Sequence, residues 1–150
     1  KGLERILNHY EQVLRIKSLR NELKKEGIPD TKTKSIETHA NGIMSAEIKK
    51  IAKEVIEEHY EGEKGRQNEL ENGVTIAFNK LANRIDKGFH VEIKVKQLEQ
   101  PEEDEEITDD EQEKMDLVSS IQESTRNIEF LEASGESILK LPESKKKASS

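Results

Sequence analysis

The sequence predicts a mainly α-helical protein, with long amphipathic helices and one or two β-strands around residues 89–97. Apolar residues recur every three or four positions before residue 27 and again after residue 109, whereas residues 89–96 alternate apolar and polar side chains. Hydrophobic residues make up only 31% of the chain and charged residues 38%. An average soluble domain has about 45–50% apolar residues, glycine included, and about 25% charged ones. We therefore expect an extended rather than a compact arrangement.

The first element is predicted to be a helix over residues 3–26. It should end at the sequence Gly27-Ile28-Pro29, because glycine takes the left-handed conformation that closes a helix and proline cannot continue one. The apolar face of this helix is longer than a short chain can easily cover. We therefore expect part of it to contact another protein, through Leu3, Leu7, Tyr10 and Leu14.

Residues 30–60 are predicted to form two helices. A short helix over residues 34–40 would end at a turn, Asn41-Gly42, and Ser45 would begin a second helix. This division also permits a loose helix-turn-helix over residues 33–53. Its second helix would bring three side chains towards nucleic-acid phosphates, namely Lys49, Lys50 and Lys53.

The next two segments carry the strand predictions. Residues 70–85 fit a helix, although residues 74–78 alternate after Asn72-Gly73 and leave a hairpin strand as the alternative. Because a lone strand leaves backbone groups unpaired, we expect the strand at 89–97 to pair with another chain. Its contact residues would be Phe89, Val91, Ile93 and Val95.

The remaining sequence is divided by charge. Residues 1–100 would form a helical domain ending in the strand, and residues 101–113, with nine acids and no base, an acidic linker. Thr108 and Glu111 form a capping box for the next helix, which is predicted to extend through residues 114–141. Residues 142–150 would be a disordered basic tail. Apolar residues of the last helix follow a coiled-coil repeat that weakens near Gly135, with predicted contacts at Leu117, Ile121, Ile128 and Leu131.

The sequence indicates little catalytic or metal chemistry. It has no cysteine, and none of its four histidines follows a carboxylate by three positions, the spacing of a helical di-iron site. Phosphate-binding glycine loops and nucleophile motifs are absent from it. We therefore expect no catalytic residue, no metal site and no cofactor. Because the sequence shows no signal peptide and no apolar run long enough for a membrane, we expect an intracellular protein or a virion component.

Together these features favour a non-enzymatic helical assembly or adaptor protein. It would act through protein–protein contacts in a homo-oligomer or a larger complex, a role that suits a viral or bacterial structural component. The alternative is a small nucleic-acid-binding protein that uses residues 33–53. An isoelectric point near 5.3 disfavours this alternative, because a net negative charge opposes binding to phosphates.

Overall fold

The computed structural model describes residues 2–94, 96, 106–126, 128–131 and 135–144, and the chain divides into two units. The three-helix unit combines Gly2–His90 with the segment that begins at Phe130, and the second unit contains Val91–Glu129. The described residues form four helices and no strand, so the protein is mainly helical, as predicted.

Helix α1 spans Gly2–Lys25 and ends as its sequence predicts. Gly27 has a φ of 82° and its N–H donates to the carbonyl of Lys24, while the N–H of Ile28 donates to the carbonyl of Leu23. These two hydrogen bonds satisfy carbonyls that the end of a helix leaves without partners. The helix end is therefore determined by the local sequence.

Helix α2 spans Asp30–His59 without interruption, so the predicted turn at Asn41-Gly42 is wrong. The helix-turn-helix over residues 33–53 is wrong for the same reason. Buried side chains at Ala40, Met44 and Ile48 carry one apolar stripe straight through the expected turn. Burial of that stripe outweighs the cost of a glycine inside a helix, about 1 kcal/mol relative to alanine.

Helix α3 spans Lys64–Asp86, so residues 74–78 are helical and the favoured prediction is confirmed. The predicted strand that follows is wrong. Residues 89–94 and 96, the described part of 89–97, form no strand. The described residues contain no strand with which this segment could pair, and the side chains of Phe89 and Ile93 are exposed.

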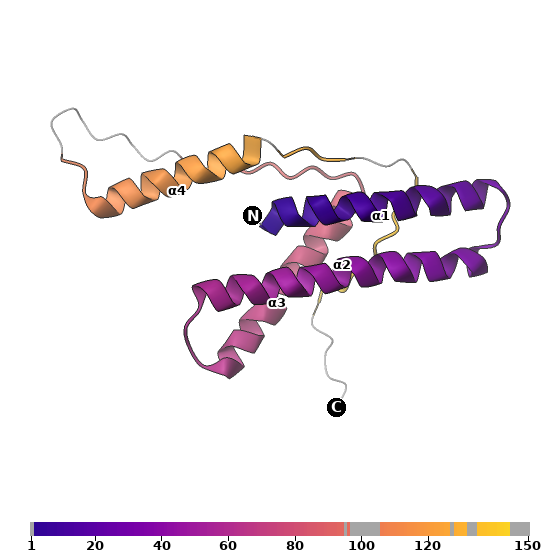
Figure 1. Ribbon diagram of the computed structural model, residues 1–150, viewed down its shortest axis with the longest axis horizontal. Coiled ribbons are helices and arrows are strands. Elements are labelled where there is room, and N and C mark those ends of the chain that lie inside the picture. The colour runs from indigo at the N-terminus through magenta and orange to yellow at the C-terminus, as the bar shows by residue number, and fades with distance from the viewer. Residues whose placement is uncertain (1, 95, 97–105, 127, 132–134, 145–150) are drawn as a thin grey trace. The chain divides into compact units, whose positions relative to one another are not determined.

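One core is formed by α1, α2, α3 and residues 135–144. Figure 1 shows α1 and α2 running antiparallel, with α3 crossing them. The helices place apolar side chains in the core at three- and four-residue steps, as amphipathic helices do. The C-terminal segment adds three more, so its removal would expose apolar surface. The buried apolar residues are Ile6, Leu7, Tyr10, Val13, Ala40, Met44, Ile48, Ile51, Ala52, Ile56, Ala82, Ile85, Ile138, Leu139 and Leu141.

The second unit contains helix α4, Asp109–Arg126. Its predicted capping box is confirmed: the Thr108 N–H donates to Glu111 Oε2 at 3.0 Å, and the Glu111 N–H donates to Thr108 Oγ1 at 3.4 Å. The helix is shorter than the predicted 114–141, because residues 135–141 join the core of the three-helix unit in a non-helical conformation. Burial of an apolar segment against other helices thus replaces the extension of α4.

Two glycines, one within α3 and one just after its end, should respond to alanine in opposite ways. Gly88 has a φ of 89°, where a Cβ is strained, so we expect Gly88→Ala to lower the free energy of unfolding by about 1 kcal/mol. Gly73 lies within the helix, with no described atom within 4 Å of an added Cβ. Gly73→Ala should therefore raise the free energy of unfolding by about 0.5–1 kcal/mol. Urea unfolding measures both changes, and equal effects would contradict these backbone assignments.

Candidate functional site

The candidate site is formed by residues 135–144, here called the strap, and by the helix side chains that bind it. The strap makes no helix or strand of its own, yet four of its N–H groups and five of its carbonyls are hydrogen-bonded to side chains of α1, α2 and α3. Buried backbone groups must be paired, and here helix side chains replace the neighbouring strands of a sheet. We call Arg20, Asn41, Asn79, Asn83 and Asp86 the clamp residues.

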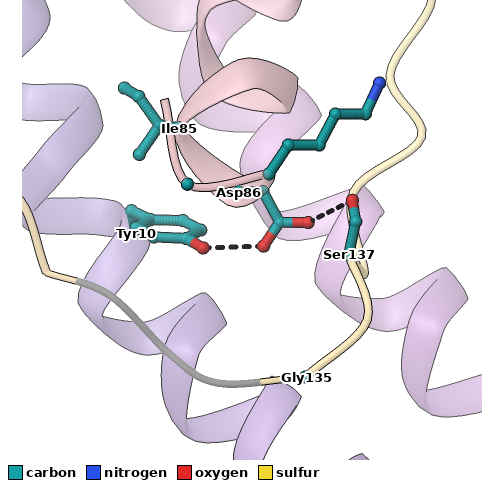
Figure 2. A pocket seen from close by; sticks show the side chains of 7 residues that line it. Tyr10, Ile85, Asp86, Gly135 and Ser137 are labelled. Atoms are coloured by element: carbon teal, nitrogen blue, oxygen red, sulfur yellow. Dashed lines mark hydrogen bonds between the residues drawn. The ribbon is translucent and has the colours of Figure 1, made fainter. Parts of the chain in front are cut away.

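The carboxylate of Asp86, the last residue of α3, accepts three hydrogen bonds from the strap and two from side chains of α1. Figure 2 shows the bonds from Tyr10 and Ser137. The Asp86 side chain is fully buried, and both carboxylate oxygens accept hydrogen bonds from distant parts of the chain. Charge-assisted hydrogen bonds of this kind are shorter and stronger than neutral ones. The five donors are Tyr10 Oη at 2.6 Å and Lys17 Nζ at 3.2 Å to Oδ1, and Ser137 Oγ at 2.8 Å, Ile138 N at 2.6 Å and Leu139 N at 2.8 Å to Oδ2.

Lys17 makes the negative charge of Asp86 tolerable at this position. An acid at the C-terminus of a helix faces the negative end of the helix dipole, which disfavours it. The buried ammonium of Lys17 offsets this, because Nζ binds the carboxylate and also the backbone carbonyl of Asp86 at 3.1 Å. Burial acts to raise the pKa of Asp86, but hydrogen bonds from Tyr10, Leu139 and Ser137 and the charge of Lys17 together hold that pKa below its usual value. Burial and the hydrogen bond to Asp86 raise the pKa of the Tyr10 hydroxyl, so it stays protonated as a donor.

Arg20 binds the beginning of the strap. Its guanidinium is only 1% exposed and donates to the carbonyls of Glu136 and Ser137, the latter at 3.2 Å. The same group pairs with Glu37 of α2 at 3.2 Å and with the side chain of Asn21. A planar guanidinium with several donors fits this task, because it can hold two carbonyls while its charge is balanced elsewhere.

Three asparagines bind the rest of the strap backbone. Asn41 of α2 donates to the carbonyl of Ile138 at 2.9 Å and accepts from the N–H of Lys140 at 2.7 Å. Asn83 of α3 donates to the carbonyl of Leu141 and accepts from its N–H, both at 2.9 Å. An amide side chain offers a donor and an acceptor side by side, as a peptide group does. The three asparagines therefore bind the strap backbone from two helices, α2 and α3.

The side chains of the strap are bound selectively. Ile138, Leu139 and Leu141 are at most 5% exposed, whereas Lys140 is exposed. The Ser137 hydroxyl points to Asp86 beside a cavity of about 380 Å³, which Tyr10, Ile85 and Gly135 help to line (Figure 2). The pattern that fits the site is therefore serine, two aliphatic residues, any residue, and a third aliphatic residue.

The predicted contact residues differ in their burial. Leu7 and Tyr10 are buried in the core of the three-helix unit, and Leu3 and Leu14 are half-buried. The other predicted contacts are exposed or half-buried, except Val95, which lies outside the described residues. The exposed ones are Phe89, Ile93, Leu117 and Leu131, the half-buried ones are Val91, Ile121 and Ile128, and the lysines Lys49, Lys50 and Lys53 are exposed on α2.

Sequence reasoning missed every clamp residue. The signal was present in α1, where the buried positions Tyr10, Val13, Lys17 and Arg20 follow one another at three- and four-residue steps. Two basic residues on the apolar face of a helix indicate buried charges that need acidic or carbonyl partners. The partner of Lys17, Asp86, lies 69 positions away, too far along the chain for any local pattern to connect them.

The structure also bears on metal and membrane binding. Within the described ranges, no three histidine or acidic side chains are close enough to hold a metal ion. No described helix is long and apolar enough to cross a membrane.

Asp86→Asn should be strongly destabilising. An amide cannot accept all five hydrogen bonds, and the change leaves the buried Lys17 ammonium without a counter-charge, a loss of about 3–5 kcal/mol in the free energy of unfolding. Urea unfolding at neutral pH measures this loss. Adding Lys17→Met should restore part of it, because the uncompensated charge is then removed.

The matched control is Asp110→Asn on α4, which removes an exposed ion pair with Lys114 and should leave the free energy of unfolding almost unchanged. A loss below about 1 kcal/mol for Asp86→Asn, or no recovery in the double variant, would contradict the central role given to Asp86.

No protein family matches this chain, and neither a curated protein nor a solved structure is similar to it.

Proposed function

We propose that the protein is a non-enzymatic assembly or adaptor module that works by binding an extended peptide segment in the three-helix unit. The observation that carries the proposal is the recognition of the strap backbone by helix side chains. The strap occupies this site as an internal ligand. A segment of a partner protein with the same pattern would take its place, and the oligomer or larger complex would form through that exchange.

The chemistry of the site supports recognition of a peptide in trans. Domains that bind extended peptides obtain affinity from main-chain hydrogen bonds and specificity from pockets for alternate side chains. Asn41 and Asn83 supply main-chain hydrogen bonds, and the buried positions of Ile138 and Leu141 supply the pockets. Asp86 adds a specific partner for the hydroxyl of Ser137.

The connectivity of the chain supports exchange. The helices that form the site end at Asp86 and the strap begins at Gly135, so each hydrogen bond described between a clamp residue and the strap joins residues more than 50 positions apart. The strap is thus connected to the site by the intervening chain, which acts as a covalent tether. The tether favours binding of the chain's own strap only by raising the local concentration of the strap at the site. A partner segment with better contacts, or at higher concentration, can therefore compete.

Exposed apolar side chains are candidate secondary contacts of such a complex. Phe89 of the three-helix unit is 62% exposed and Leu117 of α4 is 61% exposed. Surface residues of this size favour interfaces when they cluster, although single ones are common. The coiled-coil contact predicted for α4 would be one of these secondary contacts.

Exchange can be tested in the full chain without substituting a clamp residue. A protease site inserted within residues 101–105 of the full chain is cut after folding, so that only non-covalent contacts hold the strap. A fluorescent peptide with the sequence of residues 135–144 is then titrated into the cut protein and followed by anisotropy. We expect saturable binding, accompanied by release of the original C-terminal fragment.

The control peptide carries Ile138→Asp and Leu141→Asp, which place charges in two buried positions and should abolish binding. The contradicting result is that the native peptide never binds the cut protein, while the two fragments remain associated or unfold together. The strap would then be a permanent part of the core, and the proposed function would be refuted.

A further inference from the structure

Asn79 of α3 is a clamp residue whose hydrogen bonding is incomplete. The residue is 4% exposed, and its Nδ2 donates to the carbonyl of Pro142 at 2.8 Å. The Oδ1 atom of the same amide is buried, and among the described residues no group donates to it. A buried polar atom without a partner is uncommon in folded proteins, because it loses its hydrogen bonds to water without replacement.

The neighbouring asparagine shows the complete form of this contact. Asn83, one helical turn along α3, donates to the carbonyl of Leu141 and accepts from the N–H of the same residue. Asn79 makes only the first of these two bonds with residue 142. Residue 142 is proline, which has no backbone N–H to donate. The unpaired Oδ1 atom is thus the half of a two-bond contact that a proline cannot complete.

Resting on the proposed function, we propose that the preferred partner segment of this site has a residue other than proline at the position of Pro142, whose N–H is donated to Asn79 Oδ1. The partner would then have the pattern serine, aliphatic, aliphatic, any residue, aliphatic, and a residue with a backbone N–H. The strap of this chain is a replaceable internal ligand with one hydrogen bond fewer than its competitor. Its tether compensates for that missing bond until the partner arrives.

Pro142 also suits an internal ligand for a second reason. A proline restricts the residue before it to extended conformations, and Leu141 is the residue that Asn83 binds by both backbone groups. The strap is therefore prearranged for Asn83 while it is denied the full contact with Asn79. The strap therefore occupies the site in the free chain, whereas a segment that also donates an N–H to Asn79 Oδ1 would bind more tightly.

Three peptides of residues 135–144 test the proposal in the cut full-length protein. One has the native Pro142, one has Pro142→Ala, and the third has N-methylalanine in place of Pro142, which matches alanine but lacks the N–H. We expect the alanine peptide to bind about two- to tenfold more tightly than the N-methylalanine peptide, the effect of one net hydrogen bond. In Asn79→Leu protein, which keeps the volume of the side chain, this ratio should fall to one.

Equal affinity of the alanine and N-methylalanine peptides, or a ratio that survives in Asn79→Leu, overturns the proposal while the proposed function stands. Absence of binding by all three peptides refutes both. A measurement within the intact chain guards against a variant that fails to fold in the cut form. In the intact Pro142→Ala chain, donation to Asn79 should slow hydrogen exchange at the amide of residue 142. Adding Asn79→Leu should make this exchange faster, and equal exchange rates in the two variants overturn the proposal.

Discussion

The three-helix unit depends on one buried carboxylate. Asp86 joins α1, α3 and the strap, because its two oxygens accept hydrogen bonds from Tyr10 and Lys17 on one side and from Ser137 and the two following backbone N–H groups on the other. An ionised carboxylate is very costly to bury unless it is paired and hydrogen-bonded. Parts of the chain that are far apart in sequence must therefore meet at this point for the charge to be accommodated.

Side chains on helices bind the backbone of the strap, which forms no helix or strand of its own. Main-chain groups of the strap need partners, and a sheet would supply them from other backbones. Here Arg20, Asn41, Asn83 and Asp86 supply them from side chains fixed on helices. Because each clamp side chain is positioned by its own helix, the site is defined by the helices and not by the segment that occupies it. That separation between site and occupant is what makes exchange chemically reasonable.

Local features were the most predictable from the sequence. The end of α1 at Gly27 and the capping box at Thr108 each depend on a few adjacent residues, and both are confirmed. The turn assigned to Asn41-Gly42 was wrong because tertiary burial overrides local turn preference, and because Asn41 uses its amide to bind the strap. The strand predicted at 89–97 was wrong over its described residues, 89–94 and 96, because alternation leads to a strand only where a neighbouring strand exists, and the described residues contain none.

The candidate site was not predictable because its energetics are long-range. Lys17 and Arg20 resemble solvent-facing basic residues until the helical register is compared with the apolar stripe, and Asn79 and Asn83 carry no local signal of burial. The strap could not be recognised either, because Gly135 and Ile138 still fall in the register of the weakening heptad repeat, which favoured a continued helix. The described hydrogen bonds that bind the strap to the helices all join segments more than 50 positions apart.

Amide hydrogen exchange of the strap tests the central claim most directly. The N–H groups of Ile138 and Leu139 are bound by the buried carboxylate of Asp86, so in the native chain they should exchange as slowly as the amide of Ile48 in the middle of α2. Protection of Ile48 together with exchange of Ile138 and Leu139 at the rate of an unstructured peptide would contradict the claim that the clamp residues hold the strap.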